Sequence, residues 1–120
     1  MERVQFIGHK GKKILYLYFA DGKPNKVLQV IEQAKPTIKT QPHRSVYTLT
    51  DVTNSAFNGA LFDAMKDFVL HNKPYVVASA VVGVTGLEQI ILNAVMKLSG
   101  RKLTAFENLG AATDWLVSQA

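Results

Sequence analysis

Polar side chains gather in one loop that follows a predicted strand. The strand SVYTLTDV, residues 45–52, leads through this loop into a predicted helix. Open α/β sheets usually place binding sites just beyond the carboxyl ends of their strands. The candidate interaction or ligand loop consists of Asp51, Thr53, Asn54, Ser55, Asn58 and Gly59. The same residue types also form ordinary turns and helix caps, so a purely structural role for this loop is the competing interpretation.

A second candidate is the turn Gly83-Val84-Thr85-Gly86, which opens onto another predicted helix. Free backbone amides at a helix N-terminus can bind an anion, so Gly83, Thr85 and Gly86 form a candidate anion site. The turn lacks the spacing of a P-loop and of a dinucleotide-binding fingerprint. Thr85 and Glu88 also fit a capping box, in which the two side chains close the helix start. Simple capping is therefore the alternative to anion binding.

No catalytic or metal-binding signature accompanies these two segments. The sequence has no cysteine, and its three histidines, His9, His43 and His71, have no spacing that resembles a metal site. Serine, histidine and aspartate all occur, but no G-x-S-x-G elbow frames a nucleophile. We therefore predict a protein without enzyme activity, catalytic residues, metal or cofactor.

The composition is typical of one folded domain, residues 1–120. Hydrophobic residues make up 48% of the chain and charged residues 19%, which excludes a disordered chain. The lack of cysteine, the polar N-terminus and the absence of an apolar run of about 20 residues predict a cytoplasmic protein without a membrane span. The net charge is +5, but no nucleic-acid-binding motif accompanies the basic turn at residues 9–13, so no nucleic-acid partner is predicted.

The elements that would position the two candidate segments alternate between strands and helices. Two apolar runs around a polar turn predict a hairpin. The predicted strands cover residues 4–8, 14–19, 45–52, 75–82 and 101–106. The first helix begins at Pro24 and is expected to kink or end at Pro36. The order ββαβαβαβα predicts an α/β fold with a mixed, mostly parallel five-stranded sheet covered by helices, in which the hairpin supplies an antiparallel edge.

The strand at 75–82 and the helix after it form the centre of the predicted fold. Pro74 and Gly83 bound the strand, which is apolar enough to be buried on both faces. Apolar residues at helical spacing predict one inward face for the helix, and Gly100 is the expected stop. That predicted face consists of Leu87, Ile90, Ile91, Ala94, Val95 and Leu98.

Several stretches of the chain together resemble one family of small bacterial proteins. They are ERVQFIGHKGKKILYLYF, the strand ending in LTDVTNS, AVVGVTGLEQIILNAV, SGRKLTAF and the closing AATDWL. Over essentially its whole length the sequence is similar to SpoIIAA-like proteins, relatives of the STAS domain of anti-sigma-factor antagonists and sulfate transporters. The resemblance implies a SpoIIAA-like, STAS-like fold. It also implies a regulatory domain that contacts a protein partner through the loop at residues 51–59.

In antagonist STAS domains the corresponding loop carries a D-S-S-G motif, whose serine is phosphorylated by the partner kinase. Here the helix start is Ala56-Phe57-Asn58-Gly59, which keeps the glycine but has no serine immediately before it. Ser55 and Thr53 are the nearest hydroxyls. This departure from the motif puts the phosphorylation switch in question.

The alternative function is a binder or carrier of a small apolar or lipid-like ligand, because proteins of this fold are structurally similar to CRAL-TRIO lipid-binding domains. Five aromatic residues are candidates to line an apolar pocket, although such residues are more often plain core. They are Tyr16, Tyr18, Phe57, Phe62 and Phe68. A homodimer is compatible with either function, since the edge strand of the hairpin must be covered or paired.

Overall fold

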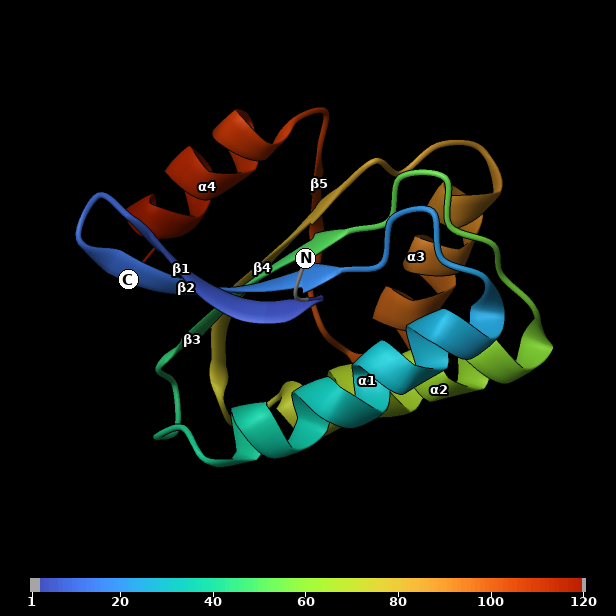
Figure 1. Cartoon of the computed structure of the whole chain (residues 1–120), viewed down its shortest axis with the longest axis horizontal. Helices are drawn as coiled ribbons and strands as arrows, with labels where there is room; N and C mark the ends of the chain where they lie inside the picture. The colour runs from blue at the N-terminus through green and yellow to red at the C-terminus, as the bar shows by residue number, and fades with distance from the viewer. Residues whose placement is uncertain (1–2, 120) are drawn as a thin grey trace.

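A five-stranded sheet with the strand order β1-β2-β3-β4-β5 runs through the molecule in the computed structural model, which describes residues 3–119 (Figure 1). The strands are β1 (Val4–His9), β2 (Lys12–Tyr18), β3 (Val46–Asp51), β4 (Val76–Val82) and β5 (Thr104–Phe106). The helices are α1 (Pro24–Lys39), α2 (Gly59–Asn72), α3 (Leu87–Ser99) and α4 (Leu109–Ser118). The predicted order and fold class are confirmed.

The hairpin supplies the antiparallel edge of the sheet, as predicted. Strands β1 and β2 pair antiparallel from Val4 opposite Leu17 to His9 opposite Lys12. The turn between them consists of Lys10 and Gly11, both with positive φ, which is the backbone that a tight two-residue hairpin turn requires. The remaining neighbours, β2 with β3, β3 with β4 and β4 with β5, are all parallel.

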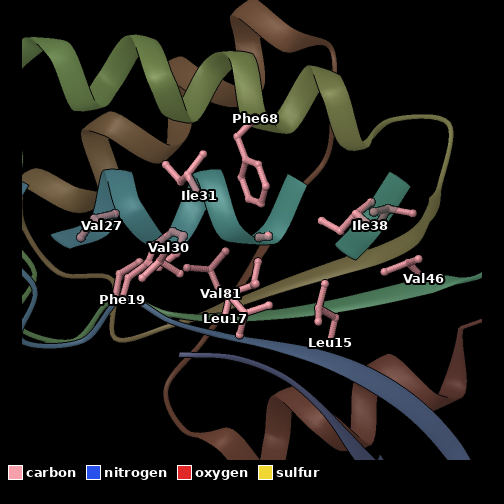
Figure 2. Close-up of a cluster of buried hydrophobic side chains, with 14 of the residues drawn as sticks. Leu15, Leu17, Phe19, Val27, Val30, Ile31, Ile38, Val46, Phe68 and Val81 are labelled. Carbon is pink, nitrogen blue, oxygen red and sulfur yellow. The ribbon is translucent and has the colours of Figure 1, made fainter. Parts of the chain in front are cut away.

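Helices cover both faces of the sheet, with α1, α2 and α3 on one face and α4 on the other (Figure 1). Alternate side chains of β2 enter two separate cores, because successive residues of a strand point to opposite faces. Leu15 and Leu17 pack under α1 and α2, where Phe68 points from α2 toward the sheet (Figure 2). Ile14 and Tyr16 pack under α4. Among residues 3–119, no helix is both long and apolar enough to cross a membrane.

Helix α1 continues past Pro36 to Lys39. Of the two outcomes expected at Pro36, a kink or an end, the end is therefore wrong. Proline inside a helix removes one backbone hydrogen bond and crowds the preceding turn. Ile38, on the last turn, is fully buried together with Ala34, so the burial of these side chains offsets the cost of the proline.

Helix α4 is joined to the hairpin by polar contacts across the sheet. The Asp114 carboxylate lies 2.8 Å from His9 Nε2 and 3.0 Å from Lys10 Nζ. These contacts hold the pKa of Asp114 below its usual range, with the His9 hydrogen bond as the larger cause. Lys12 Nζ donates to the backbone carbonyl of Gln119 at 3.1 Å. Residues more than 100 positions apart in the sequence therefore close this face of the sheet.

Candidate functional site

The two candidate segments of the sequence meet at one edge of the sheet, beyond the carboxyl ends of β3 and β4. The backbone amide of Val52 donates to the carbonyl of Val82 at 2.9 Å. One residue further on, Gly83 lies against Thr53 with φ at +87°. A Cβ at Gly83 would lie 2.8 Å from both Cα and N of Thr53, and closer still to its Oγ1. Only glycine fits this close approach of the two loops.

Asp51 is a buried acceptor within the loop. Its Oδ1 accepts hydrogen bonds from the backbone amide of Thr53 at 3.0 Å and from Thr53 Oγ1 at 2.6 Å. The Tyr16 hydroxyl makes a longer contact of 3.4 Å with Oδ2. Asp51 and Thr53 therefore hold the turn that follows β3. These contacts occupy the carboxylate with the protein's own donors.

The buried position of Tyr16 and the nearby Asp51 change the pKa of the Tyr16 hydroxyl. Burial is the largest cause that raises the pKa of Tyr16 to about 12, followed by the nearby charge of Asp51. Burial and a neighbouring negative charge both disfavour the ionised phenol. At neutral pH the hydroxyl is therefore protonated and serves as a hydrogen-bond donor.

The rest of the loop combines structural contacts with exposed side chains. The backbone amide and the hydroxyl of Ser55 both donate to the carbonyl of Val52, at 3.0 and 2.7 Å. Asn58 is the N-cap of α2, since its Oδ1 accepts from the amide of Leu61 at 2.8 Å. Asn54, with φ at +56°, is exposed, and so is Gly59 at the start of α2. The structural role of the loop is thus well defined, and its role in binding stays a prediction.

The predicted capping box at α3 is wrong. Gly86, with φ at +47°, is the N-cap of α3, and no side chain caps the helix start. Thr85 and Glu88 are instead linked through their backbones, because the amide of Glu88 donates to the carbonyl of Thr85 at 2.9 Å. A capping box would need Thr85 itself as the N-cap. Anion binding by Gly83, Thr85 and Gly86 stays a prediction, and the carboxylate of Glu88 in the first turn opposes it.

An apolar cavity of about 60 Å³ lies between the sheet and the helices α2 and α3. Its lining includes Leu17 and Val81 from the strands, Phe68 from α2, and Leu92 and Val95 from α3. Phe57 and Phe68 are the aromatic residues of the predicted pocket that line this cavity. Tyr16 and Tyr18 lie on the opposite face of the sheet, because β2 alternates, and Phe62 does not line the cavity either. For these three residues the expectation of a shared pocket is wrong.

Helix α3 presents a different face to the cavity from the one predicted. Its lining residues are Glu88, Ile91, Leu92 and Val95. This stripe is offset by one residue from the predicted stripe, which corresponds to about 100° of rotation around the helix. Ile91 and Val95 belong to both stripes. Leu87, Ile90 and Leu98 were predicted to point inward, but 62%, 67% and 59% of their surface is exposed.

The cavity has a polar end, formed where Arg101 follows α3. Arg101 donates from Nη1 to the carbonyl of Val69 at 3.1 Å and from Nη2 to Ser79 Oγ at 3.0 Å. Ser79 in turn accepts from Thr48 Oγ1 at 2.7 Å. All four residues line the cavity. Burial lowers the pKa of the Arg101 guanidinium, which nevertheless stays charged at neutral pH.

Comparison with known proteins identifies a solved structure with a similar architecture. No family model matches the sequence, and no curated protein does. A crystal structure of an uncharacterized protein of the DUF3478 family from Shewanella loihica, described as having a SpoIIAA-like fold, superposes with a TM-score of 0.73. The match covers 94% of this chain and 91% of that one, at 15% sequence identity. This chain has a SpoIIAA-like fold. At this identity the likeness shows the fold alone.

Sequence reasoning missed the polar end of the cavity in this SpoIIAA-like fold. Arg101 was expected to be the first residue of the last strand, and nothing in its spacing pointed to a half-buried position beside the cavity. Its two partners, Val69 and Ser79, are 32 and 22 residues away in the sequence. One weak signal in the sequence could have pointed to this position. Arg101 directly follows Gly100, which ends α3 in the αL conformation, and from there the arginine side chain can turn back under the helix.

Proposed function

We propose that this SpoIIAA-like domain is a non-enzymatic binding domain whose ligand is a small molecule with an apolar body. The ligand occupies the cavity between the sheet and the helices α2 and α3. The observation that carries this proposal is the cavity itself, which is apolar along most of its lining and polar at one end. Ligand sites of proteins typically combine these two features. No chemistry is assigned to Asp51, because its carboxylate is engaged within the loop.

The size of the cavity sets a condition on binding. Its volume of about 60 Å³ is well below the roughly 300 Å³ of the smaller drug-sized pockets. A ligand with more than a few carbon atoms therefore requires α3 to move away from the sheet. Gly86 and Gly100, both with positive φ, flank α3 and are suited to absorb such a change in backbone angles.

Mass spectrometry of the freshly purified protein tests this proposal. We expect the native mass to exceed the chain mass, and we expect this excess to disappear on denaturation. In the variant Leu92→Phe the larger side chain occupies the cavity, so this variant should bind no ligand. Leu98→Phe, on the exposed side of the same helix, should still bind the ligand. A bare wild-type chain that also takes up no added alkyl compound would contradict the proposal. The native mass also reports whether the protein is a dimer.

Binding of a protein partner at the loop of residues 51–59 is a second candidate function. The supporting observation is that exposed side chains, including Asn54 and Ala56, stand on a hydrogen-bonded framework. The amide of Asp21 donates to the carbonyl of Thr53 at 2.8 Å, and the amide of Ala56 donates to the carbonyl of Gly22 at 3.0 Å. Such a framework lowers the entropic cost of binding because the loop is already ordered.

An arginine introduced into the exposed part of the loop tests this second candidate. We expect Ala56→Arg to abolish capture of a partner that the wild-type protein captures, because the new side chain blocks close contact. The matched control is Gln33→Arg on the exposed surface of α1, which adds the same charge and should leave capture unchanged. Equal capture by the wild type and both variants would exclude the loop as the contact surface.

A further inference from the structure

The guanidinium of Arg101 has only neutral partners in the part of the chain that the structure describes. Arginine carries five N–H donors. Two hydrogen bonds engage this group, and their acceptors are a backbone carbonyl and a serine hydroxyl. Within residues 3–119, no carboxylate oxygen lies within 4.0 Å of the guanidinium nitrogens. Arg101 is half-buried. A charged group that has lost part of its hydration is stabilised by an opposite charge, so this group is suited to receive an anion.

The polar groups that surround Arg101 at this end of the cavity are neutral ones. Thr48 and Ser79 are buried on the face of the sheet that α1, α2 and α3 cover. The hydrogen bond from Thr48 fixes the Ser79 hydroxyl next to Nη2 of Arg101. Asn72, at the end of α2, is buried and also lines the cavity. The rest of the lining is mostly apolar, with Glu88 in the first turn of α3 as its acidic member. One end of the cavity is thus cationic and polar, and the middle is apolar.

We propose that the ligand is a single-chain amphiphile with a carboxylate head, which pairs with Arg101. Its alkyl chain lies along Val81, Leu92 and Val95, in the cavity widened by the movement of α3. This inference rests on the proposed function and adds the class of ligand to it. The planar guanidinium can hold a carboxylate through two parallel hydrogen bonds, which gives the pair both strength and direction. The shape of the cavity alone would select a ligand by the length of its alkyl chain. Arg101 additionally selects a ligand whose head group is an anion.

A purely structural role for Arg101 is the alternative. Val69 belongs to the last turn of α2, whose carbonyls have no partners within the helix, and a cation is favourable at that end. A capping arginine would contribute to stability but would not discriminate between ligands with different head groups. The two roles therefore differ in what a change of head group does to binding.

A chain-matched pair of ligands, decanoate and decanol, separates these roles by isothermal titration at neutral pH. We expect the wild-type protein to bind decanoate at least tenfold more tightly than decanol. Arg101→Gln should remove this preference by weakening decanoate binding and leaving decanol binding unchanged. Lys102→Gln, the same charge change at the adjacent exposed position, should keep the preference.

Each other outcome has a defined meaning. Equal binding of decanoate and decanol to the wild-type protein overturns the assignment of the head group and leaves the proposed apolar site standing, and this measurement needs no variant that folds. Binding of neither compound overturns both. A preference that survives Arg101→Gln, or one that Lys102→Gln removes equally, also overturns the role of Arg101, because the overall charge of the protein would then explain the selectivity.

Discussion

Replacing Gly83 with alanine is expected to destabilise the protein by roughly 3 kcal/mol, because two costs combine at this position. The backbone of Gly83 has φ at +87°, which is unfavourable for alanine. The added Cβ would also lie 2.8 Å from the backbone N of Thr53, which cannot move without distorting the loop after β3. Urea denaturation of wild type and variant measures the loss in the free energy of unfolding.

Gly100→Ala is the matched control for this loss. Gly100 also has positive φ, at +71°, but a Cβ there would meet no atom within 4 Å. We expect a cost of about 1 kcal/mol, from the backbone conformation alone. The difference between the two variants measures the close approach of the two loops. Equal losses in both variants would show that the contact between Gly83 and Thr53 contributes nothing to stability.

Replacing Asp51 with alanine is expected to cost roughly 3 kcal/mol, because several donors lose their acceptor at once. The amide and hydroxyl of Thr53 and the hydroxyl of Tyr16 all direct hydrogen bonds to this carboxylate. Asp63→Ala is the control, since Asp63 is exposed on α2 and its loss should cost about 0.5 kcal/mol or less. Similar losses in the two variants would contradict a structural role for Asp51.

The same variant has a second, independent readout in the pKa of Tyr16. In the wild-type protein this pKa is about 12, and the charge of Asp51 is one of its causes. Removing a negative charge makes the ionised phenol less unfavourable, so the pKa should fall. It should stay above 10 because burial, the largest cause, remains. A spectrophotometric titration, with Tyr16→Phe to identify the signal, measures the change.

Local patterns in the sequence predicted the strands, the hairpin and the position of the loop after β3 at one edge of the sheet. Apolar residues on both faces of β2 indicated that both faces are buried. The connection predicted at residues 9–13 contains the shorter turn, Lys10 and Gly11, that is found between β1 and β2. The position of Asp51 at the end of a parallel strand predicted that the loop at residues 51–59 lies at the carboxyl edge of the sheet. Its contact with the turn at residues 83–86 was not predicted. The predicted features depend on neighbours in sequence, which a pattern reports directly.

The orientation of α3 and the polar end of the cavity could not be predicted, because both depend on distant contacts. Helix α3 is apolar around most of its circumference, so two stripes one residue apart fit the same sequence. Packing against α2 and the sheet selects the stripe with Leu92 and leaves Ile90 exposed. The partners of Arg101 come from α2 and β4, and no local spacing links them to it. Burial of Ile38 likewise overrides the local signal of Pro36.

The contacts between α4 and the hairpin have a consequence for how the protein emerges from the ribosome. The apolar side chains of Ile14 and Tyr16 are synthesised early, but α4, which covers them, is synthesised about 100 residues later. The face under α1 and α2 can close while translation continues, whereas the opposite face stays uncovered until α4 has been made. For most of its synthesis the nascent chain therefore exposes one apolar face of an incomplete sheet. This is the surface to which a chaperone would bind.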